Sequence, residues 1–239
     1  MLVSFKINKF KKVLQYASEA LKKNKEDTKL IETLARVNFY SGNNKESFKL
    51  FKLLFKILPE KTQGRFPFVA SLNYLSNVNQ EQYMSECVKF TNCLEKKLKL
   101  ENEKFKFLTK KNKKTKILFL SSDFKKHSVA FFIKDLLSKI DKSVFEVSLV
   151  SNLKIIDQDD LSIELKNLSD HWYDVEKMTD EDLVNFLKSL NIDVLIDLSG
   201  FTKGNRLEVV ARRCAKKQII WLGYNNSLFL KNVDLVLAE

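Results

Sequence analysis

His127 is the side chain in this sequence best suited to move or orient a proton. An imidazole gains and loses its proton near neutral pH, so it can act as an acid, a base or a hydrogen-bond partner. The residue follows the apolar run 117–120 and stands at the start of a helical pattern. A solvated histidine at a helix start would need no function, and both interpretations stay open. The second histidine, His171, has no comparable surroundings and is interpreted as ordinary.

Small and polar residues follow two further apolar runs of the sequence, 193–198 and 219–222. We single out Gly200, Thr202, Gly223 and Tyr224, which follow these runs, and Leu222, the last residue of the second run. Glycine lets a backbone approach a ligand closely, although a tight turn between a strand and a helix would need it equally. In open α/β sheets, ligands bind beyond the carboxyl ends of the strands. We therefore expect these residues and His127 to lie along one rim of a sheet.

From residue 116 the sequence alternates between strand and helix patterns. Apolar residues recur at helical spacing in residues 129–140, and Thr179 is a suitable N-cap for a helix over 180–190. Strands are predicted at 117–120, 145–150, 171–174, 193–198, 219–222 and 233–237. This alternation predicts an α/β fold, a doubly wound parallel sheet with helices on both faces. The sequence has no G-x-G-x-x-G, so the dinucleotide-binding fingerprint is absent.

Residues 196–224 combine a strand, a polar turn, a basic helix and a strand in one unit. Leu207, Val210, Ala211 and Cys214 recur at helical spacing, which predicts a helix that reaches Cys214. Such a unit is one crossover of a parallel sheet. The stretch 151–170 is acidic, and its pattern does not decide between helix and loop.

The amino-acid sequence of two segments resembles that of the first catalytic domain of the O-GlcNAc transferase and SPINDLY family of glycosyltransferases. One segment is K-I-L-F-L-S-S-D-F-K-K-H at 116–127. The other begins with G-F-T-K-G-N-R-L-E at 200–208 and ends with W-L-G-Y at 221–224. This resemblance implies the Rossmann-like N-terminal lobe of a GT-B fold.

The resemblance also implies a reaction, the transfer of a sugar from a UDP-sugar to Ser or Thr of protein acceptors, without a metal or other cofactor. His127 matches the family's proposed catalytic base, although a role in positioning the substrate is the alternative. The glycines and their neighbours named above would bind substrate. In this family a second lobe holds most of the nucleotide. These 239 residues do not include it, so we expect them to be inactive alone and to bind a UDP-sugar negligibly.

Two departures from the family pattern favour a second hypothesis. Phe201 replaces a tyrosine or histidine, and Asn225 follows W-L-G-Y where the family usually has proline. Both changes fall on the rim that would bind substrate. A non-catalytic helical-repeat adaptor with a degenerate transferase domain is therefore the alternative function.

The first hundred residues have a helical pattern. Residues 31–59 fit one tetratricopeptide repeat, a helix pair of about 34 residues. We predict helical repeats and linking helices over 1–100, a lysine-rich connector over 101–115 and the Rossmann-like domain over 116–239. A plain helical hairpin is the alternative for the first part. By resemblance the repeats would bind protein or peptide acceptors, and they could also mediate oligomerisation.

Composition excludes several classes of protein. The net charge of +12 comes from lysines spread through every element, which disfavours a dedicated nucleic-acid surface. No apolar run is long enough for a membrane span or a secretory signal, so we expect a cytoplasmic protein without a membrane anchor. The three cysteines form no C-x-x-C pair and only two histidines are present, so we expect neither disulfides nor a metal site.

Overall fold

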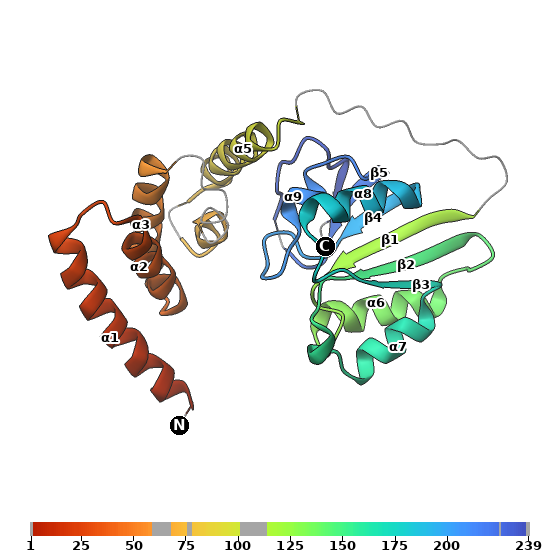
Figure 1. Cartoon of the computed structure of the whole chain (residues 1–239), viewed down its shortest axis with the longest axis horizontal. Helices are drawn as coiled ribbons and strands as arrows, with labels where there is room; N and C mark the ends of the chain where they lie inside the picture. The colour runs from red at the N-terminus through yellow and green to blue at the C-terminus, as the bar shows by residue number, and fades with distance from the viewer. Residues whose placement is uncertain (1, 59–67, 76–77, 101–113, 225, 238–239) are drawn as a thin grey trace. The chain divides into compact units, whose positions relative to one another are not determined.

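The computed structural model describes residues 2–58, 68–75, 78–100, 114–224 and 226–237, with side chains from residue 10 onward. The chain divides into two compact units, Met1–Lys97 and Leu98–Glu239 (Figure 1). Each unit has its own buried core. Most of the predicted connector, residues 101–113, lies outside the described residues, so its boundaries stay a prediction.

The first unit is helical, with α1 (Leu2–Lys23), α2 (Thr28–Tyr40), α3 (Asn44–Ile57) and α5 (Gln80–Lys97). Asp27 begins α2 by accepting hydrogen bonds from the backbone N–H groups of Lys29 and Leu30. Gly42, at φ +78°, makes the turn into α3. Ser47 is fully buried, and its hydroxyl donates to the Ala35 carbonyl at 2.8 Å. The α2–α3 pair is therefore a helical hairpin, the form that both the repeat and the plain-hairpin alternative predict.

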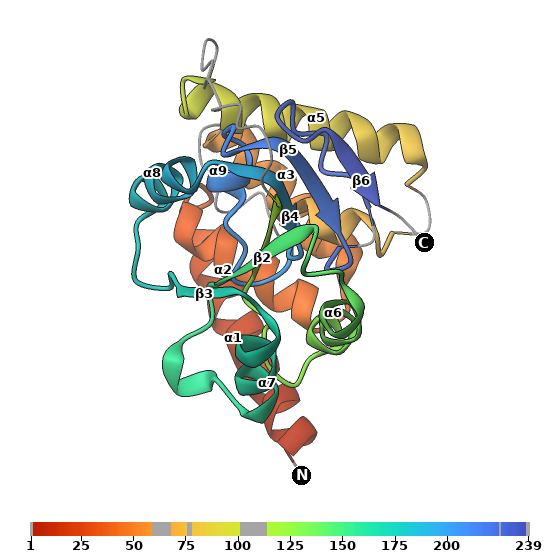
Figure 2. The same ribbon diagram turned by 90° about the vertical axis from the view of Figure 1, so that its right-hand side faces the viewer.

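The second unit is a parallel sheet of six strands in the order β3-β2-β1-β4-β5-β6. Its strands are β1 (Thr115–Ser121), β2 (Phe145–Ser151), β3 (His171–Asp174), β4 (Ile192–Asp197), β5 (Ala215–Trp221) and β6 (Leu235–Leu237). The order starts in the middle and runs outward in both directions, which is the doubly wound arrangement. The predicted α/β fold is confirmed (Figure 2).

Helices cover both faces of this sheet (Figure 1). They are α6 (Ser128–Lys139), α7 (Asp160–Leu168), α8 (Asp180–Leu190) and α9 (Leu207–Val210), with a short 3₁₀ turn at Ile155–Asp157. Apolar residues of α6 and α7, including Ile133 and Leu165, pack on Phe119 and Leu149 of the sheet. Thr179 caps α8, as predicted, by accepting a hydrogen bond from Asp182 N. Among the described helices, none is long and apolar enough to cross a membrane.

The predicted helix through Cys214 is wrong, because α9 ends at Val210. The buried side chain of Gln218 terminates α9 by binding backbone groups at and just after its end. Its Nε2 donates to the carbonyls of Val210 and Asn232 at 2.9 Å, and its Oε1 accepts from Cys214 N at 2.8 Å. These bonds supply the partners that a further helical turn would otherwise provide. The chain can therefore turn and enter β5 at Ala215.

Candidate functional site at the carboxyl ends of the strands

The carboxyl ends of the strands lie at one edge of the sheet, as the parallel register requires. Ser121 of β1 pairs with Ser151 of β2, and Leu120 pairs with Asp197 of β4. The loops that follow β1, β4 and β5 carry His127 and the five predicted binding residues. The described residues contain no group of three or more His, Cys, Asp or Glu side chains that could hold a metal ion.

His127 is the N-cap of α6 and is exposed at the end of the loop that follows β1. Its backbone is extended, with φ −145° and ψ 152°, and its Nδ1 accepts a hydrogen bond from Val129 N at 3.3 Å. Because Nδ1 is an acceptor in this contact, the neutral ring carries its proton on Nε2. The imidazole therefore has one nitrogen committed to the helix and the other available as a hydrogen-bond donor.

Gly200 and Gly223 are required by close contacts within the chain. A Cβ on Gly223 would lie 1.6 Å from the carbonyl oxygen of Leu198. A Cβ on Gly200, at φ +53°, would lie 2.4 Å from Cβ of Tyr224. The tight turn that the sequence left open thus applies to Gly200, whereas Gly223 is required by the close approach of the chain at the end of β4.

The other predicted rim residues also take part in the turn structure. Tyr224 packs edge-to-face on Phe201, with ring centroids 5.3 Å apart. The Thr202 hydroxyl donates to the Ser199 carbonyl at 2.8 Å. Leu222 packs against the sheet core and has a positive φ of 70°, which is uncommon for a residue with a side chain. These contacts fix the shape of the rim and leave a role in substrate binding as a prediction.

Asp197 ends β4 and is 1% exposed. Its carboxylate accepts hydrogen bonds from Gly200 N at 2.7 Å and from Ser199 N at 3.4 Å, and so holds the turn that carries Gly200. Burial raises the pKa of Asp197 from 3.8 to about 7, and the two N–H groups oppose this only in part. The carboxyl group therefore changes charge close to neutral pH.

We expect Asp197 to make stability depend on pH. Its pKa is higher in the folded chain, so between about pH 4 and pH 7 the folded state holds a proton that the unfolded state has lost. The free energy of unfolding should therefore fall as the pH rises through this range, by as much as roughly 4 kcal/mol. Urea unfolding of wild type and Asp197→Asn from pH 4 to pH 8 measures this. A stability difference that stays constant with pH would contradict it.

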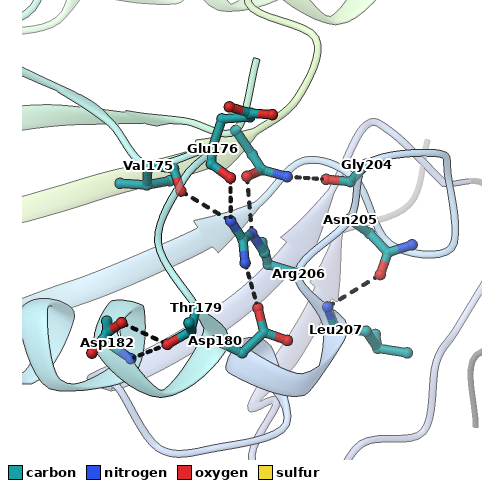
Figure 3. A network of polar contacts seen from close by, with 10 residues as sticks. Val175, Glu176, Thr179, Asp180, Asp182, Gly204, Asn205, Arg206 and Leu207 are labelled. Carbon is teal, nitrogen blue, oxygen red and sulfur yellow. Dashed lines mark hydrogen bonds and ion pairs between the residues drawn. The ribbon is translucent and has the colours of Figure 1, made fainter. Parts of the chain in front are cut away.

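Arg206 joins several rim loops through its guanidinium group (Figure 3). Its Nη1 bonds Asp180 at 2.6 Å, its Nε donates to Asn152 Oδ1 at 2.9 Å, and its Nη2 donates to the carbonyls of Val175 and Glu176. The side chain is only 13% exposed. Arg206 thus connects the loop after β4 to the loop after β2 and to the start of α8.

We expect Arg206→Ala to destabilise the second unit by about 2 to 3 kcal/mol, because it leaves Asp180 and two backbone carbonyls without their partner. Arg206→Lys should recover only part of this, since an ammonium group cannot reproduce the geometry of the guanidinium fork. Chemical denaturation of the two variants measures both effects. Full recovery by lysine would show that charge alone matters at this position.

A cavity of about 670 Å³ opens beside this network. Its lining comes from the loops after β1, β2, β3 and β4 and includes Ser122, Asn152, Lys203, Asn205 and Arg206. The lining is polar and carries charges of both signs, so it suits a ligand with several hydrogen-bonding groups. His127 and the five predicted binding residues are not among the residues that line it.

Sequence reasoning therefore missed Arg206 as a member of the site. Arg206 stands inside G-F-T-K-G-N-R-L-E, the segment that carried the resemblance. An arginine directly after a glycine-rich turn at a strand end was the available signal. Asn152 directly follows β2, at a strand end where the sequence places the rim, but its bond to Arg206 was not predictable.

The sequence is similar to a known family and to named proteins of that family. The model of glycosyl transferase family 41 matches residues 49–238. A probable UDP-N-acetylglucosamine–peptide N-acetylglucosaminyltransferase SPINDLY of Oryza sativa subsp. japonica is 30% identical over 123 residues, which are 51% of this chain and 13% of that protein. The UDP-N-acetylglucosamine–peptide N-acetylglucosaminyltransferase of Caenorhabditis elegans is 27% identical over 135 residues, or 56% of this chain and 12% of that protein.

Among solved structures, a mutant of the Thermobaculum terrenum O-GlcNAc transferase superposes with a TM-score of 0.63. The match covers 97% of this chain and 54% of the other at 19% sequence identity, and it shows the shared fold. The chain spans about an eighth of the length of the curated relatives described above. The family model, by contrast, matches most of the chain, from α3 to the last described strand. The chain belongs to glycosyl transferase family 41.

Proposed function

We propose that the protein transfers N-acetylglucosamine from UDP-N-acetylglucosamine to Ser or Thr hydroxyls of protein acceptors. The observation that carries this proposal is the family match, which runs from the helical unit through the whole sheet. The names of the relatives from rice and the nematode support the donor sugar and the peptide acceptor. The chain would contribute the helical part and the first catalytic lobe of this enzyme.

The reaction would join the acceptor oxygen to the anomeric carbon of the sugar. The bond between that carbon and the diphosphate oxygen breaks, and UDP leaves with the bonding electrons. The acceptor hydroxyl loses its proton in the same process. A group that binds this hydroxyl must therefore orient its oxygen toward the anomeric carbon or accept its proton.

The contacts of His127 support an orienting role. Its Nδ1 already accepts from Val129 N, so the neutral ring offers Nε2–H as a donor to a substrate oxygen. Service as a base through Nε2 would require the proton to sit on Nδ1, and that would remove the acceptor which caps α6. We therefore propose that His127 orients substrate while it keeps its bond to the helix.

The helical unit offers a place for the acceptor polypeptide. A cavity of about 510 Å³ lies among α1, α2 and α3. Leucines from all three helices, Leu14, Leu21, Leu34 and Leu50, line it, with Lys22, Lys25 and Glu46 beside them. An apolar groove with charged groups beside it suits a peptide that has both apolar and polar side chains. We propose that this groove contacts protein acceptors.

Isothermal titration with UDP-N-acetylglucosamine tests the donor. The complete gene product should bind it at micromolar concentrations, and UDP-glucose should bind more weakly. The 239 residues alone should show no measurable heat of binding, because we attribute most nucleotide contacts to a second lobe. Micromolar binding by these residues alone would contradict that assignment. Absence of binding by the complete gene product would contradict the proposed donor.

A further inference from the structure

The loop that leads to His127 is held by the start of α7. Phe124 is fully buried, and its carbonyl accepts a hydrogen bond from Ser162 Oγ at 2.6 Å. Two residues later, Lys126 N donates to Asp159 Oδ2 at 2.7 Å. Asp159 and Ser162 are the N-cap and third residue of α7. The backbone that precedes His127 is therefore tied at two points to a helix more than thirty positions away in sequence.

The two carboxylate oxygens of Asp159 have different partners. Oδ1 accepts from Leu161 N at 3.1 Å and from Ser162 N at 3.2 Å, which caps α7. Oδ2 accepts from Lys126 N and takes no part in those two bonds. The hydrogen bond from Lys126 N is the main cause that lowers the pKa of Asp159, so the carboxylate is charged at neutral pH. Oδ1 therefore caps α7, and Oδ2 binds the backbone of the loop that precedes His127.

The position of Lys126 N limits where His127 can lie. The backbone of His127 itself is extended, with φ −145° and ψ 152°, and in this conformation its Nδ1 lies 3.3 Å from Val129 N. The His127 carbonyl is fixed in turn by Phe131 N at 3.2 Å. Between these two fixed points the imidazole keeps the orientation in which Nδ1 meets Val129 N.

We propose that Asp159 is a positioning residue for His127, acting through the hydrogen bond from Lys126 N to its Oδ2. The consequence for catalysis rests on the proposed role of His127 in binding the acceptor hydroxyl. The positioning itself is a property of these contacts. The competing explanation is that Asp159 only caps α7, and the separate partners of its two oxygens distinguish these explanations.

Asp159→Ser separates the two roles. A serine hydroxyl is a good N-cap and should keep α7 intact, but it has one oxygen and cannot also reach Lys126 N. The matched control is Asp160→Ser, which removes the same charge at the same helix start. Asp160 is 86% exposed and contacts Lys126 only through the flexible Nζ, at 3.4 Å. Its loss should leave the loop backbone in place.

Nuclear magnetic resonance of the 239-residue chain provides the test, because its two histidines give two imidazole signals. In Asp159→Ser the His127 nitrogen shifts should move, and the Val129 amide should exchange with solvent about fivefold faster, the size of a lost N-cap. The Ser162 amide and the His171 signal should stay as in wild type. Asp160→Ser should change none of these signals.

Unchanged His127 and Val129 signals in folded Asp159→Ser would overturn the proposal. An equal change at Ser162 would overturn it as well, since the effect on the loop would then follow from loss of the α7 cap. If the serine variant does not fold, Asp159→Asn preserves size, and one oxygen can still cap α7 while its amide group faces Lys126 N. In that variant the His127, Val129 and Ser162 signals test the proposal in the same way.

These signals report the geometry of the His127 ring and do not depend on turnover. Failure of this test therefore leaves the transferase proposal standing, and failure of the transferase proposal leaves these signals interpretable.

Discussion

Replacement of His127 by alanine should lower the turnover of the complete gene product by about 10²- to 10⁴-fold, the range for loss of a positioned proton-transfer or orienting group. The fold should persist, because the side chain is exposed and its one described contact is the cap on Val129 N. Initial rates with UDP-N-acetylglucosamine and a serine peptide measure the loss, and thermal unfolding checks the fold.

Two further variants control this result. His127→Asn keeps a strong N-cap without the imidazole, so it should be as stable as wild type and nearly as inactive as the alanine variant. His171→Ala should keep wild-type turnover, since His171 is exposed on β3 and its Nε2 lies 3.4 Å from Glu146. Full activity of stable His127→Ala would show that the residue is idle, and its unfolding would show a structural role.

Gly223→Ala should prevent the second unit from folding stably, at a cost of more than about 4 kcal/mol. The added Cβ would lie 1.6 Å from the carbonyl oxygen of Leu198. That backbone is held at the end of β4, because Leu198 N donates to the Leu120 carbonyl at 2.9 Å. Urea denaturation followed by circular dichroism measures the loss of stability.

Gly42→Ala is the matched control. Gly42 also has a positive φ, but nothing lies within 4 Å of the position a Cβ would take. Only backbone strain of about 1 to 2 kcal/mol should result. If Gly223→Ala proved no more destabilising than Gly42→Ala, the close packing of β4 and β5 at the rim would be wrong.

The bounds of a helix or strand could be predicted where residues next to its ends in the sequence determine them. The bounds of β3 and α8 agree with the prediction, since α8 begins at its own cap, Thr179, and ends at Asn191 in a left-handed conformation. The end of α9 was not predictable in this way. It depends on Gln218, which reaches back from within β5 to the Val210 carbonyl.

Residues of the candidate site were likewise predictable only where the signal was local in the sequence. His127 and the glycines were found because each belongs to a short segment whose sequence resembles that of a known family. Arg206 was missed because its partners Asn152 and Asp180 lie 54 and 26 positions earlier in the chain. Asp159 was missed as well, since its bond to Lys126 spans 33 positions and lies in the stretch whose pattern was undecided. A single sequence carries no signal for such long-range pairings.

Sugar transfer itself tests the central claim most directly. The complete gene product would be incubated with labelled UDP-N-acetylglucosamine, a chelator and a peptide that contains one serine, beside the same peptide with alanine. We predict label on the serine peptide alone, one UDP released for each sugar transferred, and an unchanged rate in the chelator. Binding of the donor and the peptide with no transfer to serine would contradict the account and would favour the adaptor.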